Sequence, residues 1–334
     1  NNLTKPLVSI TCITYNHAGY IATTLESFLM QKTNFNIEVL IHDDASTDNT
    51  ANIIKIYQAK YPNIIKPIYQ TDNQYSKGVK VGNFNLERIK GKYVTPCEGD
   101  DYWTDPYKLQ TQVDYMEKNL NCSMCVHSAF NVSSNGHKMS KGIRPYTRSK
   151  TLNFVETILG GGGLFPTNSI MYRAEYASNR PEFFDIAPIG DYPLVIYLAL
   201  KGEVYYIDKK MSAYRHNSKG SWTSKILRDK EMALKNNEKI ILMFKSVDEY
   251  TCGKYSDVIE LLIMKCRLEK YMISGDKEIK YKTIYDKIIN NPYFKQLPTR
   301  SKIKITSGKY FPSLLNIVRD CRTVKNYLLE KINY

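Results

Sequence analysis

The 334-residue sequence contains no apolar run of the roughly 20 residues that a membrane-spanning helix needs. Its seven cysteines are odd in number and irregularly spaced, which argues against a disulfide framework and favours a reducing compartment. The zinc modules and aromatic strand motifs of nucleic-acid-binding domains are also missing. We therefore predict that the protein has no nucleic-acid partner. Because the first ten residues also lack a charged-then-apolar leader, we predict that the protein is cytoplasmic.

Positive charge is concentrated toward the C-terminus. The chain has 47 Lys and Arg against 33 Asp and Glu, and residues 223–334 alone hold 23 basic and 13 acidic residues, a net charge of +10. Such a basic surface attracts anionic lipid headgroups or polyanionic partners. We expect residues 223–334 to be mostly helical and Tyr-rich. They could bring the protein to the inner face of a membrane, bind partner enzymes, or form a homo-oligomer.

Apolar runs alternate with amphipathic runs through the first hundred residues, which is typical of an α/β fold with a parallel sheet covered by helices. We predict strands over 7–14, 37–41, 64–69 and 92–97, and helices over 18–31, from Ser46 or Thr47 to 60, and over 83–89. Later elements are helices over 106–118 and 191–201, strands over 123–130, 170–173 and 204–208, and long helices over 226–244 and 255–273. The change of pattern places a domain boundary at residue 222.

Polar residues follow three of the predicted strands. The clusters are Thr14, Tyr15 and Asn16; His42, Asp43 and Asp44; and residues 98–101 with the sequence EGDD. In open α/β sheets, ligands bind beyond the carboxyl ends of the strands. The three clusters therefore predict one shared site.

Four segments carry a family resemblance when they are taken together. They are VSITCITYN at 8–16, VLIHDDASTD at 39–48, CEGDDYW at 97–103 and YRH at 214–216. In this order they resemble the family-2 inverting glycosyltransferases of bacterial glycan biosynthesis, over about residues 6–222. The resemblance implies the GT-A fold, a Rossmann-like nucleotide-sugar-binding domain with a mostly parallel central sheet, followed here by a smaller helical domain.

The resemblance also implies an activity. Enzymes of this kind transfer a hexosyl or N-acetylhexosaminyl unit from a nucleotide-diphosphate sugar to a hydroxyl group. The acceptor would be a glycan, a polysaccharide or a lipid-linked oligosaccharide. A uridine nucleotide is the implied donor, although guanosine and thymidine donors also occur.

Three carboxylates form the candidate metal site. A diphosphate leaving group needs a divalent cation because negative charge builds on its phosphate oxygen. Glu98, Asp100 and Asp101 supply oxygen ligands that suit Mn²⁺ or Mg²⁺, at the position of the family's Asp-x-Asp motif. Glu98 stands where that motif starts with Asp, so we expect Asp100 to bind the metal and nucleotide directly, while Glu98 and Asp101 support it or contact the sugar. An acidic turn that caps the next helix is the alternative.

The nucleotide site is expected at the other two clusters. Asp43 and Asp44 match the family's Asp-Asp-x-Ser turn, in which a carboxylate accepts a hydrogen bond from the nucleobase. Thr14, Tyr15 and Asn16 resemble the loop that closes over the base, although ordinary packing is as good an interpretation of Tyr15. Ser46 and Asp48 are expected only to cap a helix. Two further residues, Lys77 and Asn83, lie where the family places a segment near the ribose and pyrophosphate.

Inversion in a single displacement needs one carboxylate to remove the proton of the acceptor hydroxyl. Asp191, at the start of a predicted helix, resembles the family's catalytic base, with a plain helix cap as the alternative and Asp185 as the competing carboxylate. His216 resembles a late histidine that reaches the metal or the diphosphate, although a structural role is equally open. Arg215 or Lys219 could neutralise phosphate.

Acceptor or sugar contacts are expected at four residues. Trp103 and Trp222, the only two tryptophans, could stack on a sugar ring or pack in the core. Thr167 and Asn168 follow the four-glycine run at 160–163, where the backbone can approach a ligand closely.

Two other functions are compatible with parts of the pattern. A nucleotidyltransferase of related fold would also present acidic metal ligands, but its glycine-rich, basic loop after the first strand is missing, because residues 15–19 hold no Lys or Arg. A non-catalytic scaffold that binds nucleotide or sugar is the other alternative, and the complete carboxylate clusters argue against it.

Overall fold

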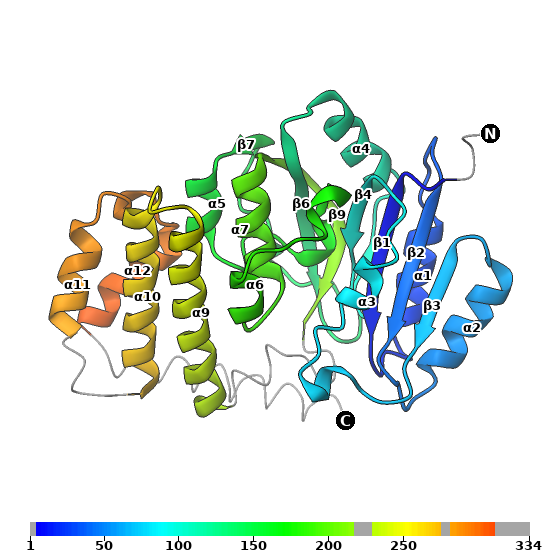
Figure 1. The fold of residues 1–334 in the computed structure, drawn as a ribbon, viewed down its shortest axis with the longest axis horizontal. Helices are drawn as coiled ribbons and strands as arrows, with labels where there is room; N and C mark the ends of the chain where they lie inside the picture. Colours follow the sequence, from blue (N-terminus) through cyan, green and yellow to red (C-terminus); the bar gives the residue numbers. More distant parts are fainter. Residues whose placement is uncertain (1–4, 217–228, 275–280, 311–334) are drawn as a thin grey trace. The chain divides into compact units, whose positions relative to one another are not determined.

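Figure 1 shows the computed structural model of the chain, which describes residues 5–216, 229–274 and 281–310. The chain forms two compact units. The first unit contains the described residues up to 157, together with 162–180 and 195–216. The second unit contains 158–161, 181–194 and the described residues after 228, so two of its segments precede the boundary predicted at residue 222.

The first unit is built on a sheet of nine strands in the described part of the chain. Its order is β3-β2-β1-β4-β8-β6-β9-β5, and β7 pairs with β9. The strands are β1 (Val8–Thr14), β2 (Ile37–Asp43), β3 (Ile65–Tyr69), β4 (Tyr93–Pro96), β5 (Tyr102–Trp103), β6 (Cys122–Val132), β7 (Lys150–Leu152), β8 (Met171–Arg173) and β9 (Glu203–Arg215). The longest ladders are parallel: β1 pairs with β2 and β4, β2 with β3, and β6 with β9. The short strands β5, β7 and β8 pair antiparallel.

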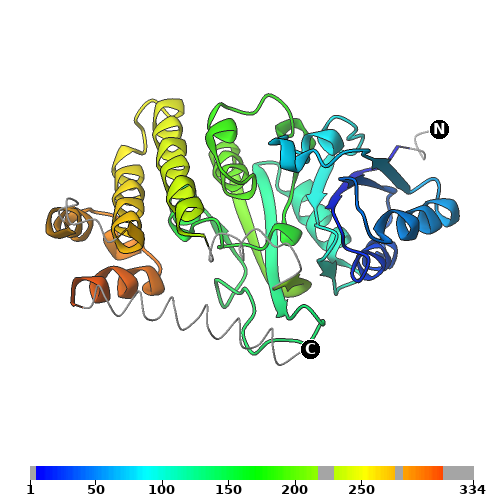
Figure 2. The same cartoon turned by 90° about the horizontal axis from the view of Figure 1, so that it is seen from below.

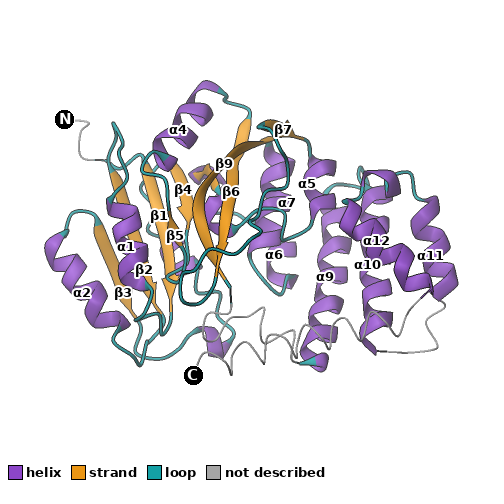
Figure 3. Cartoon of the chain, turned by 180° about the vertical axis from the view of Figure 1, so that it is seen from behind, coloured by secondary structure: helices purple, strands orange, loops and turns teal. Residues whose placement is uncertain are grey.

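Helices cover both faces of the parallel strands. Figures 2 and 3 show α1 and α2 on one face of β1 to β3, and Figure 1 shows α3 on the other. The α-helices are α1 (Ile21–Leu29), α2 (Thr50–Lys60), α3 (Asn83–Leu86), α4 (Lys108–Lys118), α5 (Phe154–Gly160), α6 (Phe183–Ile186), α7 (Asp191–Lys201), α9 (Lys230–Tyr250), α10 (Ser256–Ser274), α11 (Tyr281–Asn290) and α12 (Thr299–Tyr310). Short 3₁₀ turns are η1 (Tyr75–Lys77), η2 (Thr167–Ser169), η3 (Ala174–Tyr176) and η4 (Phe294–Gln296).

Local apolar patterns explain these elements. Val8, Ile10 and Cys12 of β1 are completely buried, as expected for a central strand of a sheet that is covered on both faces. Helix α1 buries Ile21, Leu25 and Phe28, which recur at the spacing of one helical face. The sequence predictions for β1 to β4, α1 and α4 are therefore confirmed, with shifted ends.

Two predictions in this unit were wrong. Helix α2 begins at Thr50 and not at Ser46 or Thr47, because the side chains of residues 46–48 bond to the neighbouring loop. Strand β9 runs to Arg215, seven residues beyond its predicted end at 208. The strand was predicted to end at 208 because the charged residues Lys209 and Lys210 follow. In the structure Lys209 forms an ion pair with Asp105 (2.5 Å), and the strand continues beside β6 and β5.

The described residues of the second unit after 228 are mostly helical. The ends of α9 differ by four and six residues from the predicted 226–244, and those of α10 differ by one residue each from 255–273. Helices α11 and α12 lie in the region predicted to be mostly helical but were not predicted individually. The Tyr192 ring packs edge-on against Phe244 of α9, and its hydroxyl donates to the carbonyl of Ile158.

Helices α9 and α10 each hold equal numbers of basic and acidic residues, whereas residues 281–310 hold seven basic residues and one acidic residue. None of the helices in the described part of the chain combines the length and the apolar character needed to cross a bilayer.

A lysine with no acidic partner among the described residues is buried in the first unit. Lys108, the first residue of α4, is completely buried. Its ammonium nitrogen donates to Thr95 Oγ1 (3.0 Å) and lies 4.1 Å from the centre of the Trp103 ring. Burial lowers the pKa of Lys108 to about 7, because a charge away from water is costly.

We expect Lys108 to make stability depend on pH. Between pH 7 and about 10.5 the unfolded chain holds a proton that folded Lys108 has lost, so the free energy of unfolding rises with pH, by up to about 1.4 kcal/mol per pH unit. Lys108→Met should remove this slope in urea unfolding measured from pH 7 to 10. Lys118→Met, at the exposed end of the same helix, should leave it in place. Equal slopes in Lys108→Met and the wild type would contradict the prediction.

Candidate functional site

The three polar clusters meet at one end of the parallel strands. Thr14, the last residue of β1, is in register with Asp43, the last residue of β2. The backbone nitrogen of Asp44 donates to the Thr14 carbonyl (3.0 Å), and that of Gly99 donates to the Ile13 carbonyl (3.0 Å). The loops after β1, β2 and β4 are therefore adjacent, as the sequence predicted.

Gly99 allows the loops after β1 and β4 to approach closely. A Cβ atom at this position would lie 2.5 Å from Thr14 Oγ1 and 2.9 Å from His17 Nδ1. These two side chains also bond to each other, at 3.1 Å. His17 was not among the predicted site residues, and the only signal for it in the sequence was its place three residues after Thr14. Burial lowers the pKa of His17, against the opposing effect of Asp100.

Asp101 holds three parts of the chain together. Its Oδ1 accepts from the backbone nitrogen of Arg215 (2.7 Å), and its Oδ2 accepts from Asn168 Nδ2 (2.9 Å). The side chain is buried, and burial together with the charge of Asp100 raises the pKa of the Asp101 carboxyl well above its usual value. Since both oxygens accept from the protein, the geometry favours a supporting role for Asp101.

Asp100 differs from Asp101 in one respect. Its Oδ1 is buried and has no hydrogen-bond partner among the described residues. A buried carboxylate oxygen without a partner is costly unless a ligand completes it. No group of three His, Cys, Asp or Glu side chains is preassembled in the described part of the chain. Mg²⁺ is commonly held by one or two carboxylates together with substrate phosphates and water, so the Asp100 carboxylate, with half-buried Glu98 nearby in sequence, fits such an ion.

Arg215 fixes the loop that carries Asp100. Its Nε donates to the Asp100 carbonyl (2.7 Å), its Nη1 donates to the carbonyls of Ser133 and Ser134, and the guanidinium lies over the ring of Tyr20 (4.5 Å). These bonds give Arg215 a positioning role, and its predicted contact with phosphate stays a prediction. Lys219 and Trp222 lie outside the described residues.

His216 directly follows Arg215, the last residue of β9. Its backbone nitrogen donates to the Val132 carbonyl (2.9 Å), and its ring packs edge-on against Tyr214. Burial lowers the pKa of the imidazole, so the ring is neutral at pH 7. Its Nε2 is buried without a partner among the described residues. The imidazole therefore has a free nitrogen of the kind that binds metals or accepts protons.

Two predicted acceptor contacts occupy the core instead. Trp103 is 1% exposed, packs against Phe28 and donates from Nε1 to the Asn168 carbonyl (3.0 Å). Asn168 is completely buried, and its amide bonds to Asp101, Ser212 and the Ala213 carbonyl. Neither side chain is available to a sugar, and the core alternative for Trp103 is the one that the geometry supports. Thr167 is half-buried at the start of η2.

Asp44 anchors a neighbouring turn. Its two carboxylate oxygens accept from the backbone nitrogens of Gln74 (2.8 Å) and Tyr75 (3.0 Å), at the start of η1. Asp44 therefore holds this turn, and its predicted contact with the nucleobase stays a prediction. Lys77, the last residue of η1, is exposed and pairs with Asp72 (3.6 Å). Asn83 is exposed at the start of α3.

Asp43 is buried, whereas Tyr15 is exposed. The carboxylate of Asp43 is buried at the end of β2 and accepts from the Ser46 hydroxyl. Burial raises the pKa of Asp43, while the bonds from Ser46 oppose this shift. Tyr15 is 42% exposed in the loop after β1, so its ring is free to pack against a ligand. Asn16, the next residue, uses its side-chain oxygen to accept from the backbone of Thr47.

The two candidate base residues belong to the second unit. Asp191 is the first residue of α7, as predicted. Asp185 lies within the short helix α6. Both residues make interactions within the protein.

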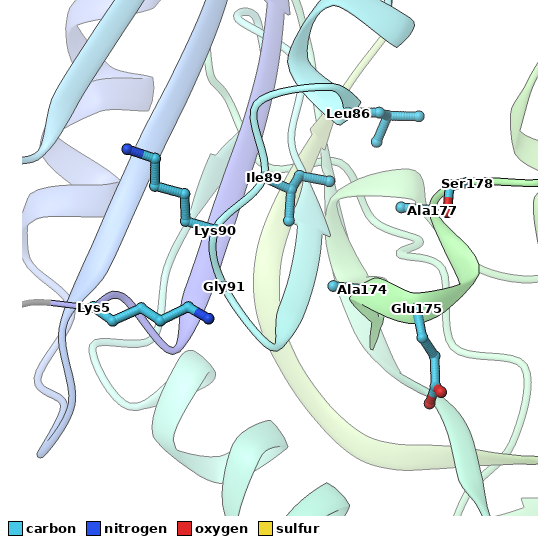
Figure 4. Close-up of a pocket in the computed structure, with 9 residues that line it drawn as sticks. All are labelled: Lys5, Leu86, Ile89, Lys90, Gly91, Ala174, Glu175, Ala177 and Ser178. Atoms are coloured by element: carbon cyan, nitrogen blue, oxygen red, sulfur yellow. The ribbon is translucent and has the colours of Figure 1, made fainter. Parts of the chain in front are cut away.

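A further hollow of about 630 Å³ lies at the opposite end of β4. Figure 4 shows its lining, which includes Lys5, Ile89, Gly91, Ala174 and Glu175. Gly91 precedes β4, whereas Glu98 to Asp101 follow it, and none of the predicted site residues lines this hollow. The hollow is therefore separate from the candidate site.

Comparison with known proteins identifies the family. The family model described as Glycosyl transferase family 2 matches residues 9–176. An uncharacterised protein of Mycobacterium tuberculosis is 37% identical over 223 residues, which cover 65% of this chain and 61% of that protein. This chain thus spans about three fifths of that relative. WfaP of Escherichia coli, named as a UDP-Glc:alpha-D-GlcNAc-diphosphoundecaprenol beta-1,3-glucosyltransferase, is 40% identical over 113 residues, 33% of this chain and 41% of WfaP.

A solved structure shares the fold. The crystal structure of S. aureus TarS 1-349 in complex with UDP-GlcNAc matches with a TM-score of 0.59 and 18% identity, covering 96% of this chain and 89% of that one. This similarity supports the predicted GT-A fold.

We expect Gly99→Ala to disturb the site. The added methyl group would collide with Thr14 and His17, so the loops after β1 and β4 must separate, at a cost of about 1–3 kcal/mol in the free energy of unfolding. Urea unfolding measures this loss. Gly19→Ala is the matched control, because a Cβ at Gly19 meets no atom within 4 Å. A Gly99→Ala variant as stable as Gly19→Ala would refute the close approach.

Proposed function

We propose that this chain, which belongs to glycosyl transferase family 2, is a glycosyltransferase whose donor is a nucleotide-diphosphate sugar bound where the loops after β1, β2 and β4 meet. The observation that carries the proposal is the buried, unpartnered Oδ1 of Asp100 at this meeting point. A diphosphate with its cation is the ligand class that would complete such an oxygen.

We propose a uridine nucleotide as the donor. Asp43 offers a carboxylate acceptor to the imide N–H of uracil, and Tyr15 offers an exposed ring beside it in the neighbouring loop. The printed names of WfaP and of the TarS complex both contain a UDP-sugar, which supports this choice. The sugar itself would be a hexose or an N-acetylhexosamine.

We propose that Asp100 holds Mn²⁺ or Mg²⁺, with Glu98 and His216 as the supporting groups. When bound, the cation stabilises the negative charge that develops on the leaving diphosphate. Asp101 keeps the loop in place through Asn168 and Arg215, so Asp100 is oriented before any ligand arrives.

We propose inversion by direct displacement, with Asp191 as the general base. A single displacement requires a carboxylate that takes the proton of the acceptor hydroxyl. Asp191 opens α7, and the N-terminal end of a helix favours the charged form of a carboxylate.

We propose that the acceptor is a glycan, a polysaccharide or a lipid-linked oligosaccharide. The net charge of residues 281–310, with seven basic residues against one acidic residue, suits contact with an anionic membrane surface or with acidic partner enzymes. In this proposal the second unit brings the enzyme to its acceptor.

We expect nucleotide binding to depend on the cation and on Asp100. In a thermal-shift panel of UDP, GDP, CDP and dTDP, each with Mn²⁺, Mg²⁺ or a chelator, UDP with cation should stabilise the protein most. A ligand at 100 times its Kd adds about 2.7 kcal/mol. Asp100→Asn should abolish the cation-dependent part of the shift, whereas Asp114→Asn, an exposed residue of α4, should not. No shift with any nucleotide would refute the proposed function.

We expect Asp191→Asn to separate binding from turnover. Because the amide cannot take a proton, the rate of sugar transfer should fall about 10²- to 10⁴-fold while the Kd for UDP stays unchanged. Calorimetry and a transfer assay measure the two quantities. Asp185→Asn serves as the comparison, and a large loss of turnover in that variant alone would move the role of base to Asp185.

A further inference from the structure

The hydroxyl group of Ser46 joins the two loops that are proposed to contact the nucleobase. Its oxygen accepts from the backbone nitrogen of Asn16 (2.9 Å), and its proton is donated to Asp43 Oδ1. One hydroxyl therefore connects the carboxylate at the end of β2 with the residue that follows Tyr15 in the loop after β1.

Other bonds hold these two loops in a fixed conformation. Asn16 Oδ1 accepts from the backbone nitrogen of Thr47 (2.7 Å), and Asp48 Oδ2 accepts from that of Ala18 (3.1 Å). Asn16 and Ala45 adopt left-handed backbone angles, with φ of 55° and 60°. Residues other than glycine rarely adopt such angles, and they persist only where the surroundings impose them. The loops are thus held together before a ligand binds.

The orientation of Asp43 decides which nucleobases it can accept. A carboxylate has about four acceptor positions, so the bond from the Ser46 hydroxyl leaves capacity for a donor of a ligand. Uracil and guanine present a ring N–H on the edge that would face Asp43, whereas cytosine presents a bare ring nitrogen beside its amino group. A carboxylate held opposite the ring nitrogen accepts from the first two bases and is repelled by the lone pair of the third. A carboxylate free to rotate would discriminate less well.

We propose that Ser46 is a positioning residue that sets the nucleobase preference of the donor site, by orienting the Asp43 carboxylate and fixing the loop of Tyr15 with one hydroxyl group. This inference rests on the proposed function. It assigns to Ser46 a role beyond the helix cap that the sequence predicted, since α2 begins only at Thr50.

The test is the ratio of the affinities for UDP and CDP, measured by calorimetry with Mn²⁺ present. In Ser46→Ala we expect this ratio to fall about tenfold or more, because the lost hydrogen bond went to a charged group. Ser46→Thr, which keeps the hydroxyl, should show the same ratio of UDP to CDP affinity as the wild type. Ser46→Cys, which keeps the shape with a weaker donor, should give an intermediate value.

Thr47→Ala is the matched control. It removes a hydroxyl from the same loop but leaves the backbone bond from Thr47 to Asn16, so its ratio should equal that of the wild type. An unchanged ratio in Ser46→Ala would overturn the inference, even if the melting temperature fell or both affinities weakened equally. A wild-type protein that binds CDP as tightly as UDP would also overturn it. A wild type that binds no nucleotide would instead refute the proposed function on which it rests.

Discussion

The carboxylate of Asp101 is the group on which the geometry of the site depends. It joins the loop after β4 to η2 through Asn168 and to the end of β9 through Arg215, positions that are 67 and 114 residues away in sequence. Arg215 in turn bonds to the Asp100 carbonyl, so the neighbouring residue is also fixed. A buried carboxylate is tolerable here because both of its oxygens accept hydrogen bonds. This arrangement leaves Asp100 with the unpartnered oxygen.

Side-chain hydrogen bonds also fix the loops after β1 and β2. Their side chains bond mostly to backbone groups of the other loop, as Asn16 does to Thr47 and Asp48 does to Ala18. Bonds of this kind fix backbone positions and leave few groups to be ordered when a ligand binds. A site that is preorganised in this way loses less conformational entropy on binding than a mobile one.

Sequence patterns predicted the elements well because burial of a strand or of a helix face is a local, periodic property. They predicted polar partners poorly. Asn168 was expected at the acceptor, and Trp103 either there or in the core; both are buried, and Asn168 bonds to Asp101. Arg215 was missed as a positioning residue because the strand that carries it continues past two lysines, one of which pairs with Asp105. Such pairings depend on contacts far apart in sequence, which periodicity does not encode.

The sequence by itself determined the family, the order of strands and helices in the first hundred residues, and the placement of three polar clusters after strands β1, β2 and β4. The clusters could be placed together from the sequence because the parallel order of the strands brings their carboxyl ends to one edge of the sheet. Only the tertiary structure decided which side chain does what at that edge. Asp43, Asp44, Asp100 and Asp101 are the same kind of residue in the sequence, and they differ only in the donors that the fold places around each carboxylate.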